Sequence, residues 1–168
     1  MFKYILFVTG LLISFSASAA TPQVIGEYGD WTAWSYAEGS NMVCYMSSTP
    51  KKDEGKYTKR GDIYVLVTHR PAEKSFDEVS FVAGYTFKSN APLVIKIANQ
   101  TFKNTFTEGD KAWMINAADD QKLVLAMKRG DRMIVDGVSS RGTATKDTYS
   151  LKGFSTAYQA ISAKCKKK

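Results

Sequence analysis

Few residues of this 168-residue chain have the type and spacing that a chemical reaction requires. His69 is the only histidine, and Cys44 and Cys165 are the only cysteines, so the chain cannot assemble the Cys/His ligand sets of structural zinc modules. A Ser–His–Asp hydrolase would have to use His69, but its place at the end of an apolar run favours a surface or hydrogen-bonded structural role. The sequence contains no nucleophile elbow and no phosphate-binding glycine loop. It therefore predicts a protein without catalytic residues, metal or cofactor.

Paired carboxylates are the second feature that could carry chemistry. They occur as neighbours in polar turns, at Asp53-Glu54, Asp77-Glu78 and Asp119-Asp120. Adjacent acids in turns are usually solvated, and the pair at 119–120 suits the start of a helix. The two carboxylates of a glycoside hydrolase can lie far apart in a sequence, so a hydrolase acting on envelope carbohydrate stays an alternative function.

The tripeptide Arg-Gly-Asp, an integrin-binding motif, occurs at Arg60-Gly61-Asp62 and again at Arg129-Gly130-Asp131. A secreted copy suggests an adhesin that binds a host receptor through Arg60, Gly61 and Asp62. The structural explanation is that Gly61 forms the turn into a strand and that Gly130 follows the end of a helix. Both explanations are open at this stage.

A polar loop at residues 50–60 holds a cluster of basic side chains: Lys51, Lys52, Lys56, Lys59 and Arg60. The whole chain has a net charge of +7. Acidic residues interrupt the cluster, which argues against a nucleic-acid partner. A solvated loop or weak attraction to anionic lipid or polysaccharide explains it better.

Aromatic residues are frequent in the expected strands: Trp31, Trp34, Tyr36, Tyr45, Tyr85 and Trp113. Aromatic side chains in a two-layer β domain usually belong to the core. Trp31 and Trp34 are three residues apart, so a regular strand cannot bury both on one face. This pair is therefore the best candidate for a partner-facing aromatic.

The chain begins with a segment typical of a secretory signal peptide. Lys3 precedes an apolar run at residues 5–15, and small residues with an Ala-x-Ala pattern follow. The run is too short to span a bilayer, which argues against a membrane anchor. We expect removal of residues 1–19 and one exported domain at 20–168, either periplasmic or secreted to the cell surface, without stable membrane insertion.

Export changes the interpretation of the two cysteines. Disulfides form and persist outside the cytoplasm, and two cysteines allow one intramolecular pairing, Cys44–Cys165. The alternative is a pair of free buried thiols. The bridge would close a loop of 121 residues, for which chain entropy gives about 4–5 kcal/mol of stabilisation.

The remaining pattern predicts a mainly β domain. Apolar and polar residues alternate along much of the chain, with turn residues between the runs. The expected strands lie at 31–36, 42–46, 62–67, 79–87, 93–97, 102–106, 112–115, 133–135 and 148–151. Residues 63–67 are nearly all apolar, which predicts a strand covered on both faces. This spacing favours a β-sandwich.

Two segments show helical signals instead. In residues 119–129, Asp119 occupies an N-cap position, basic residues end the segment and Gly130 follows. In residues 154–165, apolar side chains recur at helical spacing and place Cys165 on the apolar face. We expect two short helices, one of them at the C-terminus.

Segments spread over residues 28–165 resemble the invasion-associated locus B family of exported α-proteobacterial proteins. They are Tyr28-Gly29-Asp30-Trp31-Thr32, Val43-Cys44-Tyr45-Met46, Val67-Thr68-His69-Arg70-Pro71, residues 79–85, Ala126-Met127-Lys128-Arg129-Gly130, Ser139-Ser140-Arg141-Gly142-Thr143, Tyr149-Ser150-Leu151-Lys152-Gly153-Phe154, and Cys165. Many members carry a further cysteine shortly after the first tryptophan; Trp34 and Ser35 stand there in this chain, so a second bridge is not expected.

The resemblance implies an immunoglobulin-like β-sandwich at the periplasm or cell surface and, in some pathogens, a link to entry into host cells. It implies no catalytic residue. We therefore expect a non-catalytic envelope protein that binds an unknown envelope or host protein or glycan. The oligomeric state is not indicated by the sequence.

Overall fold

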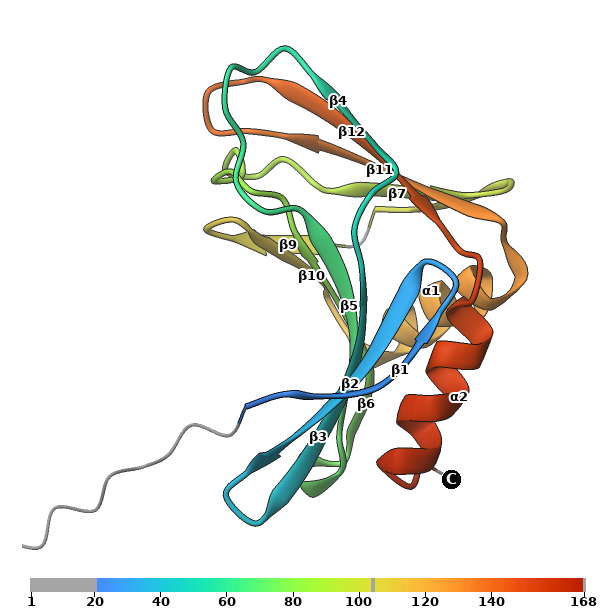
Figure 1. Cartoon of the computed structure of the whole chain (residues 1–168). Coiled ribbons are helices and arrows are strands. Elements are labelled where there is room, and N and C mark those ends of the chain that lie inside the picture. Colours follow the sequence, from blue (N-terminus) through green and yellow to red (C-terminus); the bar gives the residue numbers. More distant parts are fainter. Residues whose placement is uncertain (1–20, 104, 168) are drawn as a thin grey trace, which may run out of the picture.

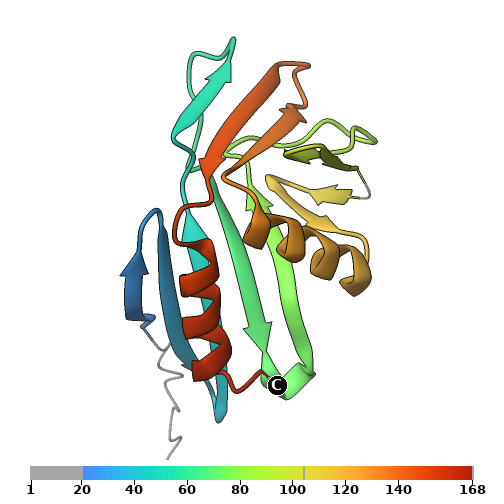
Figure 2. The same cartoon turned by 90° about the vertical axis from the view of Figure 1, so that its right-hand side faces the viewer.

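The computed structural model describes residues 21–103 and 105–167 and arranges them as two antiparallel sheets and two helices (Figures 1 and 2). This confirms the expected mainly β fold with a C-terminal helix. The predicted signal peptide at residues 1–19 lies outside the described residues. In Figure 1 the five-stranded sheet lies above, and both helices lie on the right of the seven-stranded sheet.

The larger sheet has seven strands in the order β1-β2-β3-β5-β6-β10-β9. Its strands are β1 (Gln23–Tyr28), β2 (Trp31–Glu38), β3 (Asn41–Ser48), β5 (Tyr64–Arg70), β6 (Ser75–Val82), β9 (Thr105–Glu108) and β10 (Lys111–Met114). A 3-10 turn, η1 (Pro71–Glu73), joins β5 to β6. The first strands follow one another as a meander, so each pairs with its neighbour in the sequence.

The smaller sheet has five strands in the order β4-β12-β11-β7-β8. Its strands are β4 (Lys52–Gly55), β7 (Val94–Ile97), β8 (Gln100–Phe102), β11 (Arg132–Val138) and β12 (Ala144–Ser150). The long β11–β12 hairpin forms its centre. Trp31 of the larger sheet donates its indole N–H to the carbonyl of Ser150 at 3.0 Å, and this bond ties the two sheets together.

Helices α1 (Ala117–Arg129) and α2 (Phe154–Lys164) cover the inner face of the larger sheet. α1 packs on β6 and β10, and α2 packs on β1, β2 and β3. Within the described residues, no helix combines the length and apolar character needed to cross a membrane. The ring of Phe154 meets Trp31 edge to face at 4.9 Å between centroids, so the first residue of α2 extends the core.

The turn into α2 depends on a glycine. Gly153 has φ +89°, and a Cβ at this position would lie 1.8 Å from the carbonyl oxygen of Tyr28. No side chain fits there, because β1 passes directly against the turn. This close approach sets the position at which the last helix begins.

The disulfide between Cys44 and Cys165 is present, as the sequence predicts. The two Cα atoms are 6.0 Å apart, and both residues are buried. Cys44 lies on the inner face of β3, and Cys165 directly follows α2. The bond therefore fastens the end of the last helix to an early strand.

Several local expectations are wrong. Residues 50–60 are not only a loop, because 52–55 pair with β12 as the edge strand β4. The strand expected at 79–87 ends at Val82, and Gly84 follows with φ +69°. The strand expected at 102–106 is divided between β8 in one sheet and β9 in the other. Helix α1 starts earlier than predicted, because Asn116, not Asp119, is the N-cap and accepts the Asp119 N–H.

The double variant Cys44→Ala/Cys165→Ala should lose about 2–5 kcal/mol of the free energy of unfolding, since its unfolded chain is no longer cross-linked. Urea unfolding monitored by circular dichroism measures the loss. A reducing agent should lower the stability of the wild type to the level of the variant and leave the variant unchanged. Equal stability of oxidised wild type and variant would refute the role assigned to the bridge.

Candidate functional site

Neither helix covers the outer face of the larger sheet (Figure 1). Side chains alternate along β2: Trp31 and Ala33 point into the core, whereas Trp34 and Tyr36 point outward and are half-buried. The same alternation on β5 buries Val65 on the inner face and leaves Tyr64 and Leu66 on the outer one. The prediction that residues 63–67 are covered on both faces is therefore wrong.

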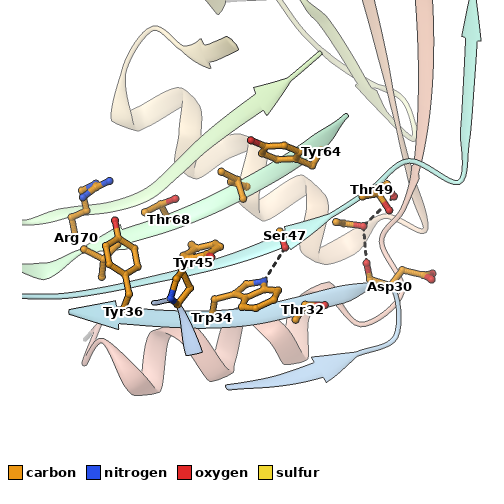
Figure 3. A pocket seen from close by; sticks show the side chains of 14 residues that line it. Asp30, Thr32, Trp34, Tyr36, Tyr45, Ser47, Thr49, Tyr64, Thr68 and Arg70 are labelled. Atoms are coloured by element: carbon orange, nitrogen blue, oxygen red, sulfur yellow. Dashed lines mark hydrogen bonds between the residues drawn. The ribbon is translucent and has the colours of Figure 1, made fainter. Parts of the chain in front are cut away.

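A groove of about 660 Å³ runs over this outer face (Figure 3). Its size is in the range of small-ligand sites. The residues that line it are Pro22, Asp30, Thr32, Trp34, Tyr36, Val43, Tyr45, Ser47, Ser48, Thr49, Tyr64, Leu66, Thr68 and Arg70. They come from β2, β3 and β5 and from the segments beside these strands. We call this feature the aromatic groove.

Three aromatic rings form the centre of the aromatic groove. Trp34 and Tyr45 are directly opposed on β2 and β3, with near-parallel rings 6.1 Å apart between centroids. Tyr36 meets Tyr45 edge to face at 6.2 Å. The indole N–H of Trp34 donates to the Ser47 hydroxyl at 3.0 Å, which fixes the tryptophan ring on the sheet. The rings are thus held in place before any ligand binds.

Charged groups mark the two ends of the aromatic groove. At one end, the Arg70 guanidinium donates to Glu38 at 3.1 Å. At the other, the Lys51 ammonium lies 2.5 Å from the Asp30 carboxylate. Hydrogen bonds from Lys51 and Ser150 hold the pKa of Asp30 below its ordinary value, so this carboxylate is ionised. Hydroxyl groups of Thr32, Ser47, Thr68 and Tyr64 lie between these ends.

The chemistry of the aromatic groove is suited to binding. Asp30 is the only carboxylate among its lining residues, and an ion pair already engages it. Acid–base hydrolysis of a glycosidic bond needs two carboxylates across the bond. The groove instead offers flat rings surrounded by hydrogen-bonding groups, the combination found in many ligand-binding sites.

His69 is buried beneath α2 and takes part in a structural hydrogen-bond network. The backbone N–H of Asp77 donates to its Nδ1 at 3.2 Å, so in the neutral ring Nε2 carries the proton and donates to Ser162 Oγ at 3.2 Å. A serine nucleophile needs the opposite arrangement, with Nε2 accepting. Burial lowers the pKa of His69 to about 4, which keeps the ring neutral at neutral pH.

The same network reaches the end of the chain. Tyr158 of α2 donates its hydroxyl to Asp77 Oδ1 at 2.6 Å, and the Lys167 ammonium pairs with the other oxygen of Asp77. The Lys128 ammonium lies 3.5 Å from the centroid of the Tyr158 ring. These contacts join α1, α2 and β6 through polar groups that would be costly to bury alone.

The Arg60-Gly61-Asp62 tripeptide does not present its arginine to a partner. The Arg60 side chain is 4% exposed, and its guanidinium forms two hydrogen bonds of 2.6 Å with Asp147 on β12. Its Nε also donates to the carbonyl of Ala83, at 2.6 Å. The expectation of a partner-facing Arg60 is therefore wrong: the side chain joins the two sheets. Gly61 and Asp62 are exposed.

The model of the family described as Invasion associated locus B (IalB) protein matches residues 31–162. The chain belongs to this family. The IalB match includes the three aromatic residues of the groove and Cys44, whereas Cys165 follows it. No curated protein and no solved structure matches the chain.

Sequence reasoning found part of the aromatic groove. It selected Trp31 and Trp34 as a pair of which one is exposed; Trp31 is buried and Trp34 lines the groove. It placed Tyr36 and Tyr45 among the aromatic residues expected in the core, and it did not select Tyr64 and Arg70 as site residues. The alternation within 64–70 was the available signal, but the apolar character of Leu66 obscured it.

Arg60→Ala should lower the free energy of unfolding by about 3–5 kcal/mol, because it leaves the buried Asp147 carboxylate without its partner. Arg129→Ala is the matched control. It removes the arginine of the second Arg-Gly-Asp tripeptide, which is exposed at the end of α1, and should cost less than about 1 kcal/mol. Chemical denaturation measures both, and equal losses would contradict the inward placement of Arg60.

The stability of His69→Gln relative to wild type should rise as the pH falls from 7.5 to 4.5. The unfolded histidine takes up a proton below pH 6.5 and the folded one only near pH 4, so acid weakens the wild type through this residue. The expected change in the stability difference is about 1–3 kcal/mol. The glutamine side chain keeps a hydrogen-bond acceptor and a hydrogen-bond donor but has no titratable group.

Comparing wild type with His69→Gln also separates the contribution of His69 to the pH dependence of stability from that of Asp120. Burial raises the pKa of Asp120 to about 6, so its contribution to stability grows as the pH falls. In the wild type, the contribution of Asp120 opposes that of His69. Because Asp120 is present in both proteins, its contribution cancels in their stability difference. Parallel pH profiles of wild type and variant would contradict a neutral, buried His69.

Proposed function

We propose that this IalB-family protein is a non-catalytic, exported protein of the cell envelope that binds a saccharide in the aromatic groove. The observation that carries the proposal is the set of rings formed by Trp34, Tyr36 and Tyr45 on the uncovered face of the larger sheet. A contiguous group of half-exposed aromatic rings on one face is more informative than a single exposed apolar residue. Their placement on an outer face is explained if a ligand covers them.

The mixture of groups in the aromatic groove favours a saccharide over a purely apolar ligand. One face of a sugar ring is rich in C–H groups and stacks on an aromatic ring, while its hydroxyls need donors and acceptors at the edge. The aromatic groove supplies rings at its centre, and Ser47, Thr68 and Tyr64 supply hydroxyls around them. The Arg70–Glu38 and Asp30–Lys51 ion pairs add polar groups at the two ends.

Binding without catalysis is supported by the use of the reactive side chains elsewhere. His69 is committed to Asp77 and Ser162, both cysteines form the disulfide, and Asp30 is paired with Lys51. The two rival functions receive less support. The adhesin would need the buried Arg60, and the hydrolase would need a second carboxylate in the aromatic groove.

Export and the link to invasion come from different observations. The leader pattern at residues 1–19 and the disulfide both fit an oxidising compartment outside the cytoplasm. The link to entry into host cells comes from membership of the invasion associated locus B family. In this proposal, saccharide binding is the molecular activity, and invasion is a consequence in those bacteria that enter host cells.

The test is binding of residues 20–168 to an array of purified bacterial and host glycans. Wild type should bind at least one saccharide, and Trp34→Ala should weaken that binding about tenfold or more, because it removes the ring at the centre of the aromatic groove. Phe106→Ala is the matched control: it removes an aromatic side chain, 48% exposed on β9, that does not line the aromatic groove.

Two outcomes would refute this function. One is the absence of glycan binding by the oxidised wild type, and the other is an equal loss in Trp34→Ala and Phe106→Ala. Thermal melting of each variant shows whether the fold is intact. Where the bacterium enters host cells, strains producing wild type or Trp34→Ala should differ in entry in the same direction as in glycan binding.

A further inference from the structure

A second concave site is formed by loops from both sheets. The ribbons of these loops lie at the left of the five-stranded sheet in Figure 1. The site is a pocket of about 360 Å³ formed by the segment after β4, the segment after β6 and the β11–β12 hairpin. We call it the basic pocket. It shares no lining residue with the aromatic groove.

The basic pocket has an unbalanced charge. Its lining includes Lys56, Lys59, Arg60 and Arg141 and no aspartate or glutamate. Asp147 neutralises Arg60 from below, but Lys56, Lys59 and Arg141 are exposed and form no ion pair within the described residues. An adjoining hollow shares Lys56 and Arg141 and likewise has no acidic lining residue. Three uncompensated positive charges therefore surround one recess.

The floor of the basic pocket is rigid. Arg60 is held by Asp147 and by the Ala83 carbonyl, and its guanidinium lies 5.0 Å from the centroid of the Tyr85 ring. The Tyr85 and Thr145 hydroxyls are hydrogen-bonded to each other at 2.6 Å. A buried ion pair thus supports the recess without cancelling the charge on its rim.

Hydrogen-bonding groups accompany the cations. Lining hydroxyls come from Thr58, Thr86, Ser140 and Thr143. Arg141 lies in the tight turn between β11 and β12, where the Thr143 N–H donates to Ser139 Oγ at 3.1 Å. This turn holds the base of the arginine. A guanidinium, two ammonium groups and several hydroxyls form a donor set for an anion with several oxygens.

We propose that the basic pocket binds a phosphate ester group on a saccharide. A doubly charged group with three free oxygens matches the cations and the hydroxyls better than a carboxylate does. The cations surround a recess that has aromatic rings of Tyr57 and Tyr85 in its wall, which suits a sugar phosphate. A membrane surface would be matched instead by cations spread over a flat face.

The sequence alone indicated half of this site. The lysine-rich loop at 50–60 suggested weak attraction to an anionic polysaccharide or lipid, with a solvated loop as the simpler explanation. The basic pocket adds Arg141 from a hairpin about 80 residues further along the chain and excludes the acids of that loop from its lining.

The test uses the ¹⁵N-labelled oxidised protein (residues 20–168) titrated with glucose 6-phosphate, glucose, inorganic phosphate and phosphatidylglycerol vesicles in separate NMR experiments. Glucose 6-phosphate should shift the amide signals of residues around Arg141, whereas glucose should not. Lys56→Gln/Lys59→Gln/Arg141→Gln should weaken that binding about tenfold or more. The control is Lys103→Gln/Lys111→Gln/Arg132→Gln, which removes the same charge from exposed positions outside the basic pocket and should bind as wild type.

Each probe supports or overturns one part of the proposal. If inorganic phosphate shifts the same amide signals but binds more weakly than glucose 6-phosphate, the site is one for phosphate esters. If inorganic phosphate binds more tightly than glucose 6-phosphate, the role of the sugar is overturned. Vesicle binding that depends on the three cations, without glucose 6-phosphate binding, would replace the saccharide with a lipid surface. Equal losses of glucose 6-phosphate affinity in both triple variants would show that binding depends on net charge alone and would overturn the proposed site. Trp34→Ala should leave the basic pocket unaffected, so failure of the aromatic groove and failure of this site are distinguishable.

Discussion

The structure depends on closing the inner face of the seven-stranded sheet with the last helix of the chain. The inner residues of β2 and β3 need a cover, and α2 supplies it through Phe154, while the Cys44–Cys165 bond fastens its far end. Because strands alternate their side chains, fixing one face inward fixes the other face outward. Covering Trp31 therefore places Trp34 and Tyr36 on the outer face, and the aromatic groove is a direct consequence of how the core is closed.

Two polar residues, Arg60 and His69, suggest a function when the sequence is considered alone. In the structure both stabilise the fold instead. Arg60 belongs to an Arg-Gly-Asp tripeptide, yet its guanidinium joins the two sheets through Asp147. His69 is the only histidine, yet its ring connects Asp77 to Ser162 of the last helix. Polar groups inside a protein need partners, so such residues are fixed by their hydrogen bonds and are unavailable to a ligand.

The two candidate binding sites lie outside the core that the helices close. The aromatic groove is on the uncovered sheet face, and the basic pocket is among loops at one end of the sheets. Strands hold the rings of the aromatic groove, and the Arg60–Asp147 ion pair holds the floor of the basic pocket, so little ordering of these groups is left for a ligand to impose. We propose the groove and the pocket as separate sites, one for a saccharide and one for a phosphate ester group, and they share no lining residue.

The sequence by itself determined the mainly β class, the two helical segments, the disulfide and the family, because alternation, helix-end residues, a single pair of cysteines and motif order are local or countable properties. Tertiary structure decided which face of each strand is covered: Leu66 and Val67 are both apolar, and Val67 belongs to the core whereas Leu66 lines the outer groove. It also decided that Arg60 is buried, because its partner Asp147 lies 87 residues away. Arg141 joined the lysines of a distant loop for the same reason: contacts between remote segments are set by packing.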